Sequence, residues 1–243
     1  METEIYKGYE IEIDNTDYAE NPFEQWDGNV PLISKHGDGG TDYSKGNINS
    51  YLETFFTDNQ IVRHQKKIAE IFNIDLQYFK DYEFSKDDKI SDIRSAIYES
   101  NDFKELEEFC QLAKIPHLRT SRNGYSQGDW SELFICETPQ FLEETGCTSL
   151  TDEMMKAGAD LYGFWAFGDV YSFNIPAIED ACSGFYGTDH EKSGLMEEAK
   201  SSIDSHIKYV TKNKFKKIKE LIKAKVSLIY RRAILEEFNQ QLC

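Results

Sequence analysis

Aromatic residues and glycines are concentrated between residues 124 and 187, and this stretch constrains the fold more than any other part of the chain. It contains two of the three tryptophans, Trp130 and Trp165, and several phenylalanines and tyrosines between residues 161 and 173. Each buried aromatic ring removes a large apolar area from water, so we expect this stretch to form the nucleus of the core. Its glycines permit positive φ angles or close backbone approach, which bulky side chains forbid.

Two short motifs frame this stretch. The first is Gly124-Tyr125-Ser126-Gln127-Gly128-Asp129-Trp130, and the second is Cys182-Ser183-Gly184-Phe185-Tyr186-Gly187. The candidate motif residues are Tyr125, Gln127, Asp129, Trp130, Asp169 and Tyr186. Gln127 and Asp129 are of types that bind the backbone of their own loop. The aromatic members are expected in the core, and an exposed base-stacking surface is the alternative.

Together the two motifs resemble a family of largely uncharacterised proteins encoded by bacteriophages and mobile elements. The resemblance covers about residues 116–206, with fainter similarity at residues 21–27. It implies a phage-related origin and suggests an anti-defence role, either anti-CRISPR or antirestriction. No set of catalytic residues comes with the resemblance, and the lysine-rich C-terminal segment lies outside it.

The charge of the chain is divided unevenly. The net charge is -17, yet residues 207–232 contain ten basic side chains and one acid, so this segment carries +9 and the remainder carries −26. Asymmetry of this kind is typical of chains that have a charged partner. The alternative is a solvated lysine face that packs against the acidic domain of the same chain.

A single basic helix is expected from about Thr211 to Leu242. Leucines repeat every seven residues from Leu221, and isoleucines widen the same face. The candidate residues for contact with a partner or a nucleic acid are Lys212, Lys216, Lys219, Lys223, Arg231 and Arg232. The four lysines follow helical spacing on the opposite face, and the aromatic residues interleaved with the basic ones are Tyr209, Phe215 and Tyr230. Because the other core positions of a coiled coil hold polar residues, a helix packed on its own domain is favoured over a dimerising helix.

The acidic remainder of the chain supports a second mode of binding. Nine carboxylates lie within residues 2–27, and further acids follow at residues 105–108, 143–144 and 152–153. Carboxylates at phosphate-like spacing are able to occupy the nucleic-acid channel of a nuclease, so nucleic-acid mimicry is expected as an alternative to ordinary solubilising charge.

The hydrophobic periodicity predicts an α+β fold. A small antiparallel sheet is expected from residues 5–13, 117–122, 129–136, 161–167 and 170–175, with helices on one face. A helical insertion is expected over residues 48–113, with a break near residue 58 and helices over 86–99 and 102–113. Shorter helices are predicted over 138–144, 149–159 and 188–206, the last with a capping box, and residues 31–46 are predicted to form a loop. The predicted division is an acidic α+β domain over 1–206 and a basic helix over 207–243.

Catalytic chemistry has less support in the sequence. Asp129, Asp169, Asp180 and His190 lie near the motifs, and a metal-dependent nuclease needs two or more carboxylates around an open site. The chain has neither a Cys-x-x-Cys nor a His-Glu-x-x-His pattern. Cys182 with His190 would suggest a thiol nucleophile, although a buried and inert cysteine on a helix face is the expected state of Cys182. We therefore expect no catalytic residues, no metal and no cofactor.

These observations predict a non-enzymatic phage-type protein in the host cytoplasm. Its expected partner is a host defence nuclease, either a CRISPR effector or a restriction enzyme, or the guide RNA or DNA of that nuclease. No membrane partner is expected, because no apolar run approaches about 18 residues and the start of the chain is acidic. The odd, widely spaced cysteines fit a reducing compartment. The alternatives are a metal-dependent nuclease or related hydrolase, and a phage structural or assembly protein.

Overall fold

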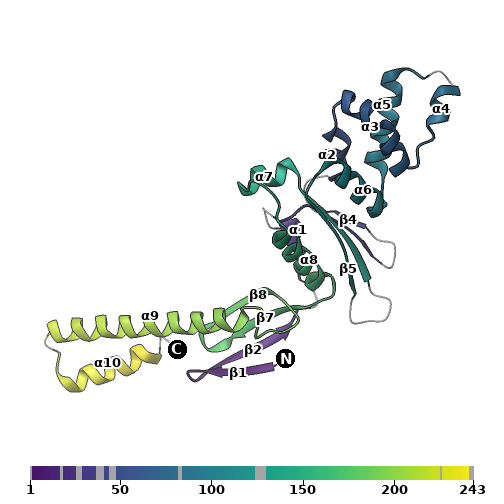
Figure 1. Ribbon diagram of the computed structural model, residues 1–243. Coiled ribbons are helices and arrows are strands. Elements are labelled where there is room, and N and C mark those ends of the chain that lie inside the picture. The colour runs from purple at the N-terminus through teal and green to yellow at the C-terminus, as the bar shows by residue number, and fades with distance from the viewer. Residues whose placement is uncertain are drawn as a thin grey trace. The chain divides into compact units, whose positions relative to one another are not determined.

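The chain divides into two compact units, which are described separately (Figure 1). One unit combines Met1–Ala19 with Gly168–Cys243, and the other is Glu20–Phe167. The computed structural model describes residues 2–16, 19–25, 29–36, 41–43, 48–81, 84–123, 130–224 and 226–240. The α+β class is confirmed, but the strands form two antiparallel sheets rather than the single sheet expected. The boundary expected after residue 206 falls within a continuous helix.

The first unit is built on a sheet with the strand order β1-β2-β7-β8. Its strands are β1 (Glu2–Tyr6), β2 (Tyr9–Asn15), β7 (Val170–Ile175) and β8 (Asp180–Tyr186). The expected strand over residues 5–13 is wrong, because Lys7 and Gly8 adopt positive φ and turn the chain back as a β-hairpin. As a result Ile5 is 76% exposed, whereas Ile11 and Ile13 of β2 are buried.

A long helix, α9 (Leu195–Lys223), covers one face of this sheet. Ile11, Ile13, Phe173 and Ile175 of the strands pack with residues of the helix that include Leu195, Ala199 and Ile203. The helix begins after Gly194, so the predicted start at the Thr188–Glu191 capping box is wrong; residues 190–194 form turns instead. Glu197 and Glu198 lie in the first turn and Lys223 in the last, which complements the helix dipole.

The predicted hairpin of residues 161–167 with 170–175 is also wrong. Residues 161–166 belong to α8 (Asp152–Ala166), whose N-terminus is capped by the Thr151 hydroxyl. Met155, Ala159 and Tyr162 are buried at spacings of four and three residues, which is helical periodicity. The partner of β7 is β8, which follows a short 3-10 turn at Pro176–Ile178.

The second unit contains a sheet with the strand order β4-β3-β6-β5. Its strands are β3 (Leu32–His36), β4 (Thr41–Tyr43), β5 (His117–Asn123) and β6 (Trp130–Cys136). The strands β5 and β6 confirm the predictions for residues 117–122 and 129–136, whereas β3 and β4 occupy part of the stretch expected to be a loop.

Helices pack on both faces of this second sheet, not on one face as expected. Ile33 and Phe134 face a core that the helical insertion completes, and Leu32 and Leu133 face a second core against α8. Side chains alternate between the two faces with a period of two along each strand. The insertion over residues 48–113 consists of α2 (Ile48–Phe55), α3 (Asp58–Ile71), α4 (Leu76–Asp81), α5 (Lys86–Glu99) and α6 (Phe103–Ala113). The remaining short helices of the unit are α1 (Pro22–Gln25) and α7 (Pro139–Thr145).

Candidate nucleic-acid interface

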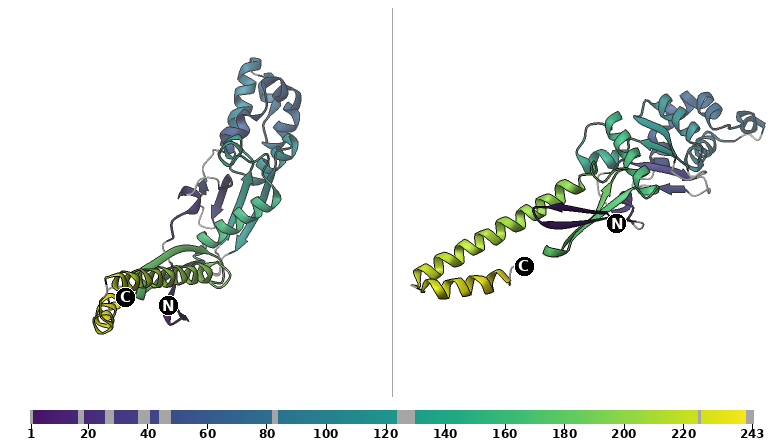
Figure 2. Two further views of the ribbon diagram at one scale, coloured as in Figure 1. Left: turned by 90° about the vertical axis from the view of Figure 1, so that its left-hand side faces the viewer. Right: turned by 90° about the horizontal axis from the view of Figure 1, so that it is seen from below.

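The helix α9 has two halves with different environments. Leu195, Met196, Ala199 and Ile203 are buried against the sheet, and the second half of the helix runs beyond the strands (Figures 1 and 2). Tyr209 and Phe215 in this second half are 62% and 59% exposed. The helix is therefore anchored by its first half, and its second half exposes large aromatic side chains to solvent.

An ion pair lies close to the boundary between the two halves, where Ile207 also packs against the core of the sheet. Lys7 Nζ, in the turn between β1 and β2, donates a hydrogen bond of 2.6 Å to Asp204 Oδ1 on α9. The hydrogen bond from Lys7 holds the pKa of the Asp204 carboxyl below its ordinary value, and the same bond raises the pKa of the Lys7 ammonium. Asp204, the last acidic residue before the lysine-rich half of α9, is thus paired with the β1–β2 turn of the sheet.

The final helix, α10 (Leu228–Gln240), folds back beside the second half of α9 (Figure 2). The Ala224 N–H donates to Glu220 O and the Val226 N–H to Leu221 O, which closes the end of α9. The expected continuous helix from residue 211 to 242 is therefore wrong. The leucine heptad does not form one stripe, because Leu221 is 8% exposed on α9 while Leu228 is 67% exposed on α10.

The lysines lie on the face of α9 opposite α10. In the second half of α9 the buried or half-buried positions are Val210, Asn213, Lys217, Ile218 and Leu221. Lys212, Lys216, Lys219 and Lys223 project from the other side at helical spacing and are exposed. We call these four residues the lysine stripe. Within the described part of the chain, they form no salt bridge.

The two arginines predicted at this interface lie on α10. Arg231 is half-buried and its Nε donates a hydrogen bond of 2.5 Å to Val226 O, which braces the turn between the helices. Arg232 is exposed. Arg232 is thus available to a partner, whereas Arg231 also has a structural contact.

The structure separates the motif residues. Tyr125, Gln127 and Asp129 lie outside the described residues, and Trp130 is described only as a backbone position at the start of β6. Asp169 and Tyr186 lie together in the first unit, where the Gly187 N–H donates to Asp169 O at 3.0 Å and Tyr186 pairs with Val170. Tyr186 is half-buried. Their role beyond holding this end of the β7–β8 pair stays a prediction.

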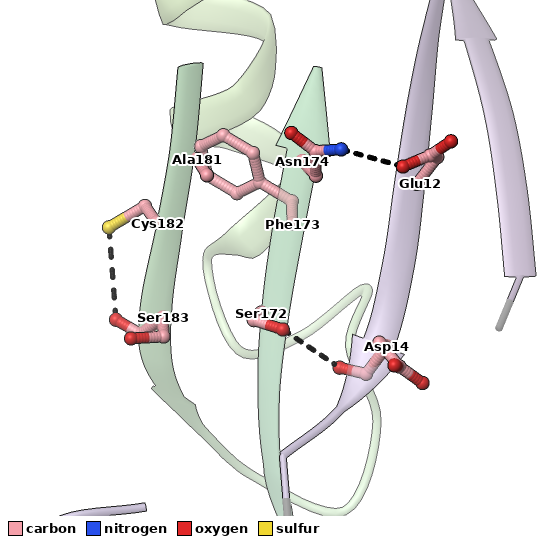
Figure 3. A pocket seen from close by; sticks show the side chains of 8 residues that line it. All are labelled: Glu12, Asp14, Ser172, Phe173, Asn174, Ala181, Cys182 and Ser183. Carbon is pink, nitrogen blue, oxygen red and sulfur yellow. Dashed lines mark hydrogen bonds between the residues drawn. The ribbon is translucent and has the colours of Figure 1, made fainter. Parts of the chain in front are cut away.

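The face of the first sheet that α9 does not cover carries a hollow of about 370 Å³ (Figure 3). It is lined by Glu12, Asp14, Ser172, Phe173, Asn174, Ala181, Cys182 and Ser183. Asn174 Nδ2 donates to Glu12 Oε2 at 2.7 Å, and Ser172 Oγ donates to Asp14 O at 3.5 Å. Two of the lining side chains thus bond to other lining residues, and the lining includes neither an imidazole nor a cation.

Cys182 is exposed on strand β8, so the expectation of a buried cysteine on a helix face is wrong. Its Sγ lies 3.7 Å from Ser183 O. His190 Nδ1 lies 3.8 Å from Glu2 Oε2, and its ring packs edge-on against Tyr171. Among the described residues, no three His, Cys, Asp or Glu side chains come together as metal ligands. Asp129, on which the nuclease alternative depends, lies outside that set, so this alternative stays a prediction.

One of the acids proposed for nucleic-acid mimicry, Glu107, is paired within the fold with Arg119, which also binds Glu132. Arg119 Nε lies 2.6 Å from Glu132, and Arg119 Nη1 lies 3.3 Å from Glu107; the bond to Glu132 raises the pKa of Arg119. Glu10, Glu12 and Asp14 instead stand along β2 on the open face of the first sheet. Glu143, Glu144, Asp152 and Glu153 of the second unit are also exposed, and mimicry by these acids stays a prediction.

The second unit contains a buried polar network that the sequence did not predict. Tyr162 on α8 places its hydroxyl 2.6 Å from Ser34 Oγ and 2.8 Å from His36 Nε2, and His36 Nδ1 lies 2.9 Å from Ser131 Oγ. Ser34, Ser131 and Tyr162 are buried. The period-two spacing of Ser34 and His36 was a signal for it, but residues 31–46 were expected to form a loop. The network joins β3, β6 and α8 and holds the second core together.

No described helix combines the length and apolar character that crossing a bilayer requires. Searches against protein-family models, curated proteins and solved structures find no match to this chain.

Proposed function

We propose that this chain is a non-enzymatic binding protein of bacteriophage or mobile-element type that inhibits a host nucleic-acid-handling defence machine. The target class is a CRISPR effector or a restriction enzyme together with its RNA or DNA. The observation that carries the proposal is the lysine stripe, which is exposed and forms no salt bridge within the described residues. The remainder of the chain carries −26, yet these lysines are not paired with its described carboxylates.

The charge of the lysine stripe favours a polyanion as its ligand. A row of exposed ammonium groups attracts the phosphate backbone and releases its condensed counterions. The second half of α9 together with α10 is called the basic helix pair. Because the rest of the chain is acidic and repels nucleic acid, contact with a nucleic acid is restricted to the basic helix pair of the first unit. A nucleoprotein offers both charges, because its phosphates match the lysine stripe and its basic channel matches an acidic strand such as β2.

The test uses the full-length protein and a purified defence nuclease with its guide or substrate. A variant in which the four stripe lysines are replaced by Gln is compared with a control that loses the same charge elsewhere. The control replaces four lysines that are exposed in the second unit, namely Lys66, Lys67, Lys86 and Lys156. We expect inhibition and complex formation to be lost in the stripe variant and retained in the control variant.

Circular dichroism checks that both variants remain folded, and a Lys→Arg version of the stripe variant should restore inhibition because it restores the charge. If the unmodified protein binds neither effector nor nucleic acid and leaves nuclease activity intact, the proposal is wrong. If the stripe variant still inhibits the nuclease, the lysine stripe is not the binding surface.

A further inference from the structure

The exposed aromatic rings around the lysine stripe narrow the class of ligand. At about 100° per residue, Tyr209 and Phe215 lie roughly 60° to either side of Lys212 on α9. Both side chains are more than half exposed, and Tyr230 on α10 is 69% exposed. Tyr209 and Phe215 therefore lie exposed on the two sides of the lysine stripe, where they would contact a ligand of the lysines.

From this arrangement we infer that the ligand of the basic helix pair is a single-stranded nucleic acid. The inference rests on the proposed function and specifies its nucleic-acid partner. Sequence-tolerant binding of single strands combines a basic track for the backbone with aromatic rings on which unpaired bases stack. The stripe from Lys212 to Lys223 spans about 16 Å of helix at roughly 1.5 Å per residue, which suits a run of a few nucleotides.

A duplex fits this surface less well, for two reasons. Its bases are already stacked on one another, so the faces that Tyr209 and Phe215 would contact are hidden. Also, α9 is paired with α10 along its second half, and two helices of about 10–12 Å diameter each are too wide for a major groove of about 12 Å. The lysine stripe carries no Arg, Asn or Gln that would read base edges.

An anionic membrane surface is the competing ligand for a basic helix. Helices that lie on membranes separate an apolar face from a lysine face. In α9 the side opposite the stripe, which includes Ile218 and Leu221, lies against α10, and the aromatic rings flank the lysines instead. This placement favours a strand that has both phosphates and exposed bases.

The experiment measures binding of the full-length protein to labelled oligonucleotides by fluorescence anisotropy. The probes are a single strand of about 20 nucleotides, long enough for one site, and the same strand annealed to its complement. Vesicles containing anionic phosphatidylglycerol are tested in parallel. We expect the single strand to bind at least about tenfold more tightly than the duplex, with stacking as the cause. The slope of log K against log salt should be about −3, at roughly 0.7 for each of four neutralised phosphates.

Two variants separate stacking from charge. Replacing Tyr209 and Phe215 by Leu keeps apolar side chains and removes the rings, so single-strand affinity should fall about tenfold or more while the salt slope stays the same. The matched control is Tyr98→Leu on α5, an exposed tyrosine of the second unit, which should change nothing. Replacing the lysine stripe by Gln should flatten the salt slope instead.

The outcomes are distinguishable. Equal or tighter binding of the duplex, or full affinity without the two rings, would overturn the single-strand inference while the proposed function stands. If the protein binds anionic vesicles and neither oligonucleotide, the inference is wrong. If it also fails to bind a defence nuclease, the proposed function is wrong as well.

Discussion

The ammonium group of Lys7 lies 2.6 Å from the carboxylate of Asp204, and this contact joins the first hairpin of the sheet to α9. It lies near the end of the part of α9 that packs on the strands, ahead of the part that carries the lysine stripe. Tyr6 adds a second hydrogen bond from its hydroxyl to Asp204 at 3.4 Å. The direction in which the basic half leaves the sheet is therefore fixed by contacts within the first unit.

Replacing Asp204 by Asn should lower the thermal midpoint at neutral pH, and the effect should vanish in acid. The pKa of Asp204 is lowered in the folded state, so the stability from this pair is fully present above the unfolded pKa of about 3.9. It is lost as the pH falls through the folded pKa. Thermal unfolding of both proteins from neutral pH to below pH ~3 checks this, and added salt should shrink the difference because the pair is partly exposed.

A control for charge alone is Asp92→Asn, which removes an exposed carboxylate of α5. An Asp204 effect that persists unchanged in strong acid, or that the Asp92 variant reproduces, would contradict this account.

The anchoring of α9 predicts a contrast between two isoleucines of the same helix. Ile203 is fully buried against the sheet, and Ile222 is 51% exposed in the basic half. Ile203→Ala removes methyl groups from a packed core and should lower the free energy of unfolding by about 2–5 kcal/mol. Ile222→Ala should change it by no more than about 0.5 kcal/mol. Urea unfolding followed by circular dichroism measures both, and equal effects would show that α9 is not held as described.

The sequence predicted the elements with strong local signals. The helices α5 and α6 follow a regular apolar spacing, and the structure has them within a residue of the prediction. In the structure, the side chains of Ser85 and Asp102 cap their N-termini. The exposure of the lysine stripe also follows from helical spacing alone. These features depend on residues close together in the chain, which a pattern along the sequence reports directly.

Some features that the sequence did not predict depend on distant contacts, and others had local signals that pointed in two directions. The strand β2 pairs with β7, which lies more than 150 residues away in the chain. The alternation of apolar and polar residues predicts a strand but does not indicate which strand it pairs with. The break between α9 and α10 contains neither Gly nor Pro, so local propensity favours one continuous helix there. Residues 161–167 are rich in aromatics, which suit strands, but α8 continues through residue 166 because its apolar positions have helical spacing.

The network around Tyr162 predicts a cost for losing one hydroxyl. The Tyr162 oxygen bridges Ser34 and His36; Tyr162 and Ser34 are buried, and His36 is half-buried. Tyr162→Phe leaves the buried Ser34 hydroxyl and the half-buried His36 ring without this oxygen and should lower the free energy of unfolding by about 1–3 kcal/mol. Tyr98→Phe, at an exposed site of the same unit, should change it by less than about 0.5 kcal/mol. A neutral Tyr162→Phe variant in urea unfolding would contradict the role assigned to the network.

The close approach of α8 to Val30 predicts the sign of a change at Gly158. A Cβ at this position would clash with Val30 Cγ2, a branched side chain in the same core. In an unhindered helix Gly→Ala stabilises by about 1 kcal/mol, so a net loss of roughly 1–3 kcal/mol in Gly158→Ala would report the clash. Adding Val30→Ala should recover part of that loss, and a double-mutant cycle by urea unfolding should give a favourable coupling of about 0.5–3 kcal/mol. If Gly158→Ala stabilises the protein by itself, or if the two changes are simply additive, then α8 does not pack on Val30 as closely as the structure shows.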